Sequence, residues 1–435
     1  MEYKEALDFI HGTYAFGIKL GLDNIGKLLE YMDNPQDKLK FVHIAGTNGK
    51  GSTSNMISNV LKHSGYKVGL FISPFLEEFT ERIQINGTQI SKESLGRVTG
   101  FVKESIDKMI ENGFPHPSEF EVVTAIGFQY FYEERVDIVT LEVGMGGRFD
   151  ATNIIKKPEI AIITSIALDH MQYLGNTIEE ITFEKAGIIK ENGDVVLYPQ
   201  GIKIENQIRQ ICIDRNAVFH TINSDLLKIK STSLSGQELS YAGGKNLSAF
   251  NFILSLLGKH QVANCITAMS AIELLIDKGY SISENSIQNA MATIQFPGRF
   301  EVLSLNPTII IDGAHNENGI DSLVNTVKTY IDKKIVLILG VLADKDFDPM
   351  IQKLLEVTSK IYTVTPNNPR AKSSEELAEH IKNNHPEIDV QALDSISDGA
   401  NIAIKGSRED IYVFVGSLYM IGDARSAVRS LQKKI

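Results

Sequence analysis

Short apolar runs alternate with longer amphipathic segments along most of the chain, a pattern typical of a parallel sheet joined by crossover helices. The first run, residues 41–45, reads as a strand, and residues 50–63 read as the helix that follows it. Further strands are predicted at residues 66–72, 137–143 and 160–165. The pattern therefore predicts an α/β fold with these strands in one sheet.

Other segments depart from this alternation. Residues 82–90 alternate apolar and polar positions around Asn86-Gly87, which predicts a hairpin beside the sheet. Residues 225–255 are rich in Ser, Gly and Leu without helical periodicity, so we expect a smaller β insertion there. A helix holding Asn264 and Ala268 should follow it, and an N-terminal helix is expected around residues 10–22.

A break in the pattern divides the chain. The sequence Gln295-Phe296-Pro297-Gly298 ends a helical segment, because Pro and Gly stop a helix and redirect the chain. The alternation then restarts, with strands expected at residues 308–311, 334–339, 361–364 and 411–415. We therefore predict a first domain at residues 1–296 and a second, smaller α/β domain at residues 297–435.

Composition narrows the class of protein. With 43% hydrophobic and 22% charged residues, the chain can bury a sizeable core, which argues against disorder and fibrous repeats. A net charge of −11 argues against broad binding of nucleic acid or anionic membranes, so an anionic ligand must be held in a local pocket. Two cysteines, Cys212 and Cys265, offer no disulfide framework, and the sequence shows neither a signal core nor a membrane-length apolar stretch. These features predict a cytosolic protein.

The strongest motif is the segment 46–52, Gly-Thr-Asn-Gly-Lys-Gly-Ser, which lies between a predicted strand and a predicted helix. Backbone N–H groups and a helix N-terminus can hold phosphate oxygens there, and Lys50 would reach the β- and γ-phosphates. The spacing departs from the common P-loop, because Ile44 stands where the first Gly is usual and Gly51 moves the hydroxyl to Ser52. The alternative is a Gly-rich turn with a solvated lysine.

Polar residues also follow other predicted strands. Glu142 ends an apolar run, so its carboxylate is expected at the C-terminal edge of a buried strand, a suitable place for Mg²⁺. The Gly144-Met145-Gly146-Gly147-Arg148 that follows offers a tight backbone and one cation, suited to a phosphate or carboxylate. Asp169-His170 closes another strand in the same way. A surface carboxylate and a structural histidine are the alternatives, and Lys185, on a predicted helix, reads locally as solvated.

The second domain brings its own candidates. Asp312 and His315 lie on the loop after its first clear strand, and Arg299 lies just past the predicted boundary. A nucleotide held between two α/β domains would need such groups from the second domain.

Taken together, these segments resemble the Mur ligase superfamily, and within it the folylpolyglutamate synthase and dihydrofolate synthase family. The resemblance covers nearly the whole chain, and its motifs occur in the family's order. They are GTNGKGS at 46–52, SPF at 73–75, FTER at 79–82, EFE at 119–121, LEVGMGGRFDATN at 141–153, TSIALDH at 164–170, EKAGIIK at 184–190, PGRFE at 297–301 and DGAHN at 312–316.

The resemblance implies an ATP-binding, Rossmann-like P-loop domain and a smaller Rossmann-like C-terminal domain that closes over it, with substrate between them. It implies that ATP and Mg²⁺ are bound and that Lys50, Lys185 and His315 are catalytic. Lys185 would be carbamylated to N6-carboxylysine, an anion able to support a second Mg²⁺, which reverses its local interpretation. The implied ATP contacts are Asn48, Gly49, Lys50, Gly51, Ser52, Asn264, Arg299 and Asp312. The implied Mg²⁺ ligands are Ser73, Glu142 and His170.

The folate and glutamate contacts follow from the same resemblance. Arg82 is expected to bind a substrate carboxylate. The other implied contacts are Ser118, Phe120, Glu121, Phe149, Asp150 and Ala151. Phe75 stands where dual-function members often carry His, and Ser118-Glu119-Phe120-Glu121 departs from their Thr-Tyr-Phe-Glu form. These departures favour polyglutamylation and leave dihydropteroate binding open.

We therefore predict an ATP-dependent, ADP-forming ligase that adds L-glutamate to the γ-carboxylate of tetrahydrofolate (poly)glutamates through an acyl phosphate, with dihydrofolate synthase activity as an open second reaction. The expected partners are a folate and L-glutamate, without nucleic acid or membrane, and a monomer is expected. Another Mur-type amino acid ligase is the nearest alternative, but its usual third N-terminal domain would not fit before residue 46. A regulatory P-loop NTPase would want an Asn-Lys-x-Asp sequence, which is absent, and a purely structural role would leave the phosphate loop without purpose.

Overall fold

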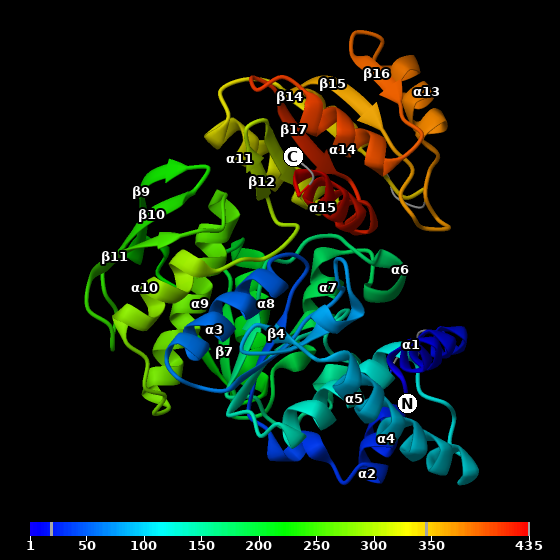
Figure 1. Ribbon diagram of the computed structural model, residues 1–435. Coiled ribbons are helices and arrows are strands. Elements are labelled where there is room, and N and C mark those ends of the chain that lie inside the picture. The colour runs from blue at the N-terminus through cyan, green and yellow to red at the C-terminus, as the bar shows by residue number, and fades with distance from the viewer. Residues whose placement is uncertain (18–20, 344–346, 434–435) are drawn as a thin grey trace. The chain divides into compact units, whose positions relative to one another are not determined.

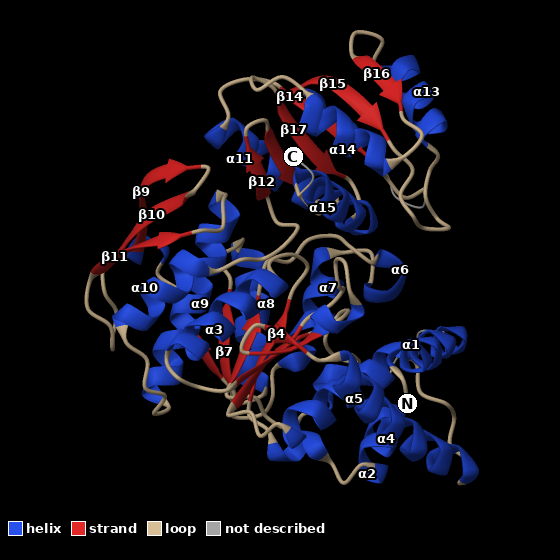
Figure 2. Cartoon of the chain, in the orientation of Figure 1, coloured by secondary structure: helices blue, strands red, loops and turns tan. Residues whose placement is uncertain are grey.

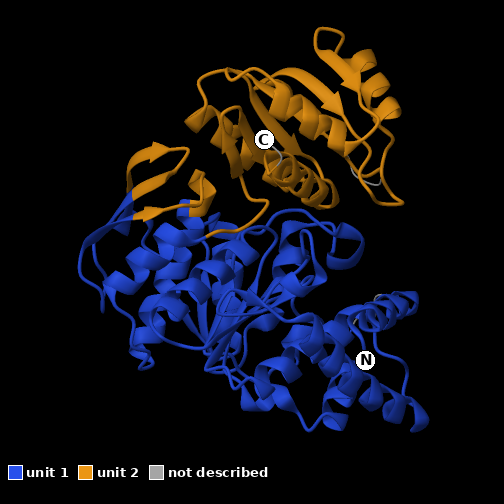
Figure 3. Ribbon diagram, viewed as in Figure 1, with its two compact units in different colours: residues 1–228, 239–252, 262–294 blue, residues 229–238, 253–261, 295–435 orange. Residues whose placement is uncertain are grey.

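The computed structural model describes residues 1–17, 21–343 and 347–433 (Figure 1). The chain forms two compact units (Figure 3). The first comprises residues 1–228, 239–252 and 262–294, and the second comprises residues 229–238, 253–261 and 295–435. The long C-terminal part of the second unit therefore begins two residues before the predicted boundary. The two short segments that group with it, 229–238 and 253–261, were not foreseen from the sequence.

The first unit contains an eight-stranded sheet with the order β4-β3-β2-β5-β1-β6-β7-β8. Its strands are β1 (Phe41–Ala45), β2 (Val68–Phe71), β3 (Ile83–Ile85), β4 (Thr88–Gln89), β5 (Ile138–Glu142), β6 (Ile160–Ile163), β7 (Asp194–Leu197) and β8 (Val218–His220). Strands β2, β5, β1, β6, β7 and β8 are parallel, and β3 and β4 form an antiparallel hairpin at one edge. The predicted α/β fold, its first four strands and the hairpin are confirmed.

This topology places the candidate chemistry. Strand β1 lies between β5 and β6, with β2 on the far side of β5. Because these strands are parallel, their carboxyl ends share one edge of the sheet, which is where open α/β sheets bind ligands. The segments that follow β1, β2, β5 and β6 therefore all leave the sheet at that edge.

Helices of the first unit cover this sheet and extend beyond it (Figure 2). They are α1 (Tyr3–Gly12), α2 (Asp23–Tyr31), α3 (Lys50–His63), α4 (Lys92–Glu111), α5 (Glu119–Glu133), α6 (Met171–Leu174), α7 (Ile178–Lys185), α8 (Ile202–Asp214), α9 (Lys259–Asp277) and α10 (Glu284–Thr293). The first three residues of α9 group with the second unit. Helix α3 has the predicted bounds, and α9 contains Asn264 and Ala268 as predicted. Helix α1 ends at Gly12 and a 3₁₀ turn follows at Thr13–Phe16, whereas residues 18–20 of the helix expected around 10–22 lie outside the described residues.

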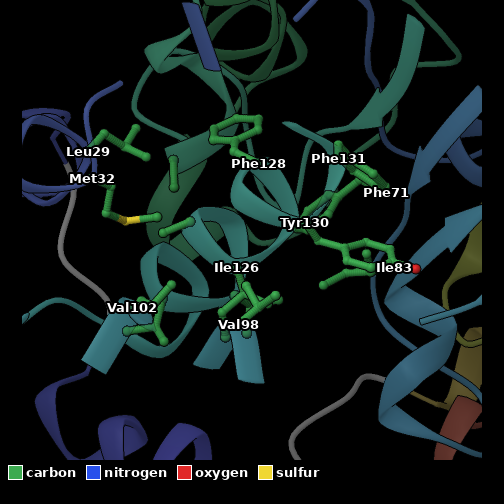
Figure 4. Packing of buried hydrophobic residues seen from close by; sticks show 14 of the residues in the cluster. Leu29, Met32, Phe71, Ile83, Val98, Val102, Ile126, Phe128, Tyr130 and Phe131 are labelled. Atoms are coloured by element: carbon green, nitrogen blue, oxygen red, sulfur yellow. The ribbon is translucent and has the colours of Figure 1, made fainter. Parts of the chain in front are cut away.

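An apolar core joins α2, α4 and α5 to the sheet (Figure 4). Leu29 and Met32 come from the α2 end, Val98 and Val102 from α4, and Phe128 from α5. Strand β2 contributes Phe71 to the same cluster. Burying this much apolar area fixes α5 against the sheet, because about 25 cal/mol is gained for each Å² removed from water.

A three-stranded sheet, β11-β10-β9, confirms the predicted β insertion. Its strands are β9 (Leu227–Ser233), β10 (Gly236–Tyr241) and β11 (Phe250–Leu254). No helix in the described part of the chain combines the length and apolar character that crossing a bilayer requires.

The second unit contains a six-stranded sheet with the order β12-β13-β17-β14-β15-β16, parallel except for β12. Its strands are β12 (Glu301–Leu305), β13 (Thr308–Ile311), β14 (Ile335–Leu339), β15 (Thr358–Thr363), β16 (Asp389–Ala392) and β17 (Ile411–Val415). Its helices are α11 (Glu317–Tyr330), α12 (Asp348–Leu355), α13 (Ser374–Asn384), α14 (Ile396–Lys405) and α15 (Leu418–Gln432). The four predicted strands are confirmed, and the edge strands β12 and β16 are additions.

Candidate functional site

The glycine-rich loop lies between β1 and α3, as the strand-loop-helix pattern predicts. Gly49, the residue before the helix, has a φ of 86°, a conformation that favours glycine. Ser52 and Gly51 are buried in the first turn of α3. The Lys50 Nζ donates to the carbonyl oxygens of Gly46 at 3.1 Å and Thr47 at 3.2 Å. The ammonium is therefore held over the loop at the N-terminal end of a fourteen-residue helix.

Hydrogen bonds attach this loop to the segment that follows β6. The Thr47 backbone N–H donates to the Ser165 carbonyl at 2.7 Å, and the Thr47 hydroxyl donates to the Ala167 carbonyl at 3.0 Å. The Ser165 hydroxyl donates in turn to the Asn48 carbonyl at 3.1 Å. Asn264 on α9 packs against the other side, because a Cβ on Gly49 would lie 2.5 Å from its Oδ1. The fold thus brings Asn264 to the loop and holds the loop in one shape.

Gly46 is the tightest point of this arrangement. Its φ is 153°, and a Cβ there would lie 1.8 Å from the Thr164 Oγ1, which itself donates to the Ala45 carbonyl. Gly46→Ala is therefore expected to lower the free energy of unfolding by about 2–4 kcal/mol and to abolish nucleotide binding. Thermal unfolding and nucleotide titration measure both effects. Gly100→Ala, where the added Cβ has no neighbour closer than 3.8 Å, is the matched control and should change stability by less than about 1 kcal/mol. Equal behaviour of the two variants would contradict this packing account.

The end of β5 brings two predicted metal ligands together. Glu142 is the last residue of the strand and is buried, so the surface-carboxylate alternative is wrong. Its Oε2 accepts the Ser73 backbone N–H at 3.3 Å. His170 is exposed, has a φ of 49° and precedes α6, while its N–H donates to the Asp169 Oδ1 at 2.9 Å. Within residues 1–17, 21–343 and 347–433, no cluster of three or more His, Cys, Asp or Glu side chains could hold a metal. A carboxylate and a hydroxyl fit Mg²⁺, which takes its remaining oxygens from phosphates and water.

Lys185 differs most from what its local sequence indicates. It is buried with 4% exposure, so the solvated interpretation from local sequence is wrong. Its Nζ donates to the Gly46 carbonyl at 2.8 Å, which places both Lys50 and Lys185 on the same oxygen. The pKa of Lys185 is lowered to about 7, mainly by burial and next by the Lys50 charge, while Asp169 and Asp150 act in the opposite direction. The i, i+4 relation to the buried Ile181 was the available signal for an inward side chain.

The loop after β5 is organised by Asp150. Its carboxylate accepts the Met145 N–H at 2.9 Å, the Thr152 N–H at 3.0 Å and the Thr152 hydroxyl at 2.5 Å. Burial raises the pKa of Asp150. The Thr152 hydroxyl also lies 2.9 Å from the Nε2 of His43 on β1, whose pKa burial lowers to about 3. His43 and Thr152 were missed by sequence reasoning, although a histidine inside the apolar run of β1 is a usable signal.

Most of the residues predicted to contact folate lie at the start of α5 or in the segment after β5. Ser118 and Glu121 form a capping box at the start of α5, where the Ser118 N–H and hydroxyl donate to the Glu121 Oε2 at 2.7 and 2.8 Å. Phe120 packs on the loop after β5, since a Cβ on Gly144 would lie 2.5 Å from its ring. Phe149 is partly exposed and Ala151 is buried in the same loop region.

Arg82 lies in the segment between β2 and β3. Its guanidinium carbon is 5.4 Å from the ring centroids of both Phe75 and Phe79. Contact with aromatic faces keeps a guanidinium oriented while its charge remains available. Phe75 is thus part of the surroundings of Arg82.

In the second unit, the structure brings Arg299, Asp312 and His315 together. The Asp312 carboxylate accepts the Phe300 N–H at 2.7 Å and the Ala314 N–H at 2.8 Å. Burial raises the pKa of Asp312, and the Arg299 charge opposes this. A Cβ on Gly313 would lie 2.7 Å from the Arg299 guanidinium, and the His315 Nδ1 lies 2.8 Å from the Gly313 carbonyl, to which it donates.

Two family models match the chain. The Mur ligase middle domain matches residues 44–272, and the Mur ligase glutamate ligase domain matches residues 298–418. A dihydrofolate synthase/folylpolyglutamate synthase of Bacillus subtilis is 35% identical, over 98% of this chain and 99% of the relative. The crystal structure of a folylpolyglutamate synthase from Thermotoga maritima is similar with a TM-score of 0.86 and 32% identity, over 98% of this chain and 97% of the other. A Mycobacterium tuberculosis folylpolyglutamate synthase, solved with ADP and AMPPCP, has a TM-score of 0.87 and 29% identity, over 99% of both chains.

Proposed function

The chain belongs to the folylpolyglutamate synthase and dihydrofolate synthase family of the Mur ligases, and from this premise we propose that it adds L-glutamate to the γ-carboxylate of a tetrahydrofolate (poly)glutamate. It is an ATP-dependent ligase that forms an amide bond. The observation that carries the proposal is the meeting of Lys50 and the buried Lys185 on the Gly46 carbonyl, at the sheet edge where Glu142 ends its strand.

The reaction follows from the weakness of a carboxylate as an acyl donor. The γ-carboxylate oxygen attacks the γ-phosphorus of ATP, and ADP leaves. The amine of L-glutamate then attacks the carbonyl carbon of the acyl phosphate, loses a proton, and expels inorganic phosphate as the amide forms. Each step develops negative charge on phosphoryl or carbonyl oxygens, so fixed positive groups supply most of the stabilisation.

This chain's residues would supply that stabilisation at named atoms. The N–H groups at the start of α3 and the Lys50 ammonium would bind the phosphates. Glu142 and Ser73, joined by a hydrogen bond, would hold Mg²⁺ together with His170. When bound, Mg²⁺ would neutralise part of the negative charge of the phosphates. The ATP contacts assigned to Arg299 and Asp312 and the catalytic role assigned to His315 stay predictions from the resemblance, as do the monomeric state and the cytosolic location.

We also propose that Lys185 is converted to N6-carboxylysine. An amine with a pKa of about 7 is about half unprotonated at neutral pH, against roughly one part in 3000 for an ordinary lysine. Only the unprotonated amine attacks CO₂. We therefore expect turnover to fall as pH decreases through about 7, because Lys185 becomes protonated, and added bicarbonate to raise turnover most near pH 7. A pH profile of kcat with and without bicarbonate measures this, and a profile that is flat from pH 6 to pH 8 would contradict it.

Dihydrofolate synthase activity is the second candidate reaction. The B. subtilis relative carries both names, which favours it. Phe75 beside Arg82, and Ser118 in the capping box of α5, are the sequence departures that count against it. Ser118 and Glu121 make the hydrogen bonds that start helix α5. The difference between Ser118-Glu119 and the Thr-Tyr of dual-function members therefore does not by itself remove a site for dihydropteroate.

The assay that tests the proposal follows ADP release with Mg²⁺-ATP, L-glutamate and one acceptor at a time, with products identified by mass. Tetrahydrofolate and its polyglutamates are expected to gain one glutamyl residue for each ADP released. Turnover on dihydropteroate as well would make the enzyme bifunctional. Failure with every pterin would contradict the proposal and favour another Mur-type amino acid ligase.

A further inference from the structure

Arg148 is a cation that the reaction proposed above leaves without a role. Its guanidinium carbon lies 4.5 Å from the ring centroid of Phe149 and 5.2 Å from that of Phe183 on α7. Both rings are more than one third exposed, with 37% exposure for Phe149 and 46% for Phe183. Two aromatic rings in contact with one partly exposed guanidinium restrict its motion while leaving its donors accessible, an arrangement suited to planar anions.

The backbone beneath this side chain is fixed. The Arg148 N–H donates to the Glu184 carbonyl at 2.8 Å, and the Asn153 side-chain amide donates to the Arg148 carbonyl at 3.0 Å. A Cβ on Gly187 would lie only 2.2 Å from the Arg148 Cα, so the two segments are in direct contact. Arg148 is therefore anchored to the turn that follows Lys185.

The ion pair of Arg148 leaves capacity for a ligand. Among the residues that the structure describes, Glu184 is the acid within ion-pair distance, through one contact of 3.5 Å from its Oε1 to the Arg148 Nη1. A bidentate ion pair between arginine and a carboxylate has two N–H···O contacts of about 2.8 Å. The remaining N–H donors of the guanidinium can bind a second carboxylate.

We propose that Arg148, held against Phe149 and Phe183, binds the α-carboxylate of a glutamate unit of the substrates. The inference rests on the proposed function. The family resemblance assigns Phe149 to Ala151 to the folate contacts, and the Lys185 Nζ is bonded to the Gly46 carbonyl of the phosphate loop. The glutamyl part of a folate is therefore expected to lie between these two places. Arg148 directly precedes Phe149, and its N–H donates to the carbonyl of Glu184, the residue before Lys185. The carboxylate comes either from the acceptor's glutamyl residues or from the incoming L-glutamate.

The test compares Arg148→Gln with the wild-type enzyme in steady-state assays that vary L-glutamate, tetrahydrofolate monoglutamate and tetrahydrofolate triglutamate separately. Loss of charge-assisted hydrogen bonds is expected to raise one KM by about 10- to 100-fold, with kcat changed less than about threefold. Arg148→Lys, which keeps the charge without the planar donor pair, should raise the same KM by a smaller factor. Arg97→Gln, which removes another exposed arginine paired with an acid (Glu133, 2.6 Å), is the matched control and should leave every KM unchanged.

The outcomes separate the two carboxylate sources. A higher KM for L-glutamate alone identifies the incoming amino acid, and a higher KM for the folates, largest for the triglutamate, identifies the acceptor. Unchanged KM values, or a fall in kcat alone, in an otherwise active enzyme would overturn the inference and leave the proposed function standing. A wild-type enzyme without folate turnover would instead overturn the proposed function itself.

Discussion

Replacement of Lys50 by methionine is expected to reduce kcat by about 10³-fold, because it removes the ammonium that we propose stabilises the transferred phosphoryl group. Lys50 Nζ also donates to two loop carbonyls, so a loss of about 1 kcal/mol in the free energy of unfolding should accompany the change. Steady-state kinetics and thermal unfolding of the same preparation measure the two effects.

Lys62→Met is the control for Lys50→Met. Lys62 lies in the last turn of the same helix and is exposed, so its replacement removes an equal charge at a distance from the loop. Kinetics close to wild type are expected for it. A Lys50→Met enzyme that keeps turnover within threefold of wild type would contradict a role for the Lys50 ammonium in phosphoryl transfer.

Replacement of Lys185 by methionine should affect activity and stability in opposite directions. Turnover is expected to fall by about 10²- to 10³-fold, since the buried amine and any carbamate formed on it are lost. The folded pKa of about 7 lies below the ordinary 10.5, so the unfolded chain binds more protons between pH 7 and pH 10.5. This buried amine therefore costs folding about 5 kcal/mol below pH 7, and the cost shrinks as pH rises through that window.

The stability gain of Lys185→Met is smaller than this cost, because the hydrogen bond to the Gly46 carbonyl is lost as well. An increase of about 3 kcal/mol in the free energy of unfolding is expected at pH 6, with no increase near pH 10.5. Urea unfolding across this pH range measures it, with the exposed Lys203→Met as control. A partial return of activity with acetate in Lys185→Ala would support an anionic Lys185. Loss of stability at pH 6 would contradict a buried amine of lowered pKa.

Local patterns were sufficient for much of the fold. The apolar run of β1, followed by glycines and an amphipathic segment, determined the strand, the loop and the bounds of α3. The edge strand β16 was not predicted, because it is short and its alternate residues face solvent. The segments 229–238 and 253–261 group with the second unit through tertiary packing, for which the sequence carries no local signal.

Some residues of the candidate site could be placed from the sequence, and others could not. Residues at strand ends, such as Glu142 and the loop after β1, could be placed because parallel strands end at one edge of a sheet. The burial of Lys185 could not be predicted from the sequence, because it depends on how α7 packs beside the Gly46 carbonyl. The contact of His43 with Thr152 joins residues 109 positions apart, and only the assembled sheet reveals it.

A folate carboxylate is expected to become an acyl phosphate before the amide forms. The measurement that tests it most directly follows ¹⁸O from the γ-carboxylate of a labelled tetrahydrofolate during turnover with ATP and L-glutamate. One ¹⁸O atom is expected in inorganic phosphate for each glutamyl residue added, with ADP unlabelled. Unlabelled phosphate, or ¹⁸O appearing in AMP, would contradict the account.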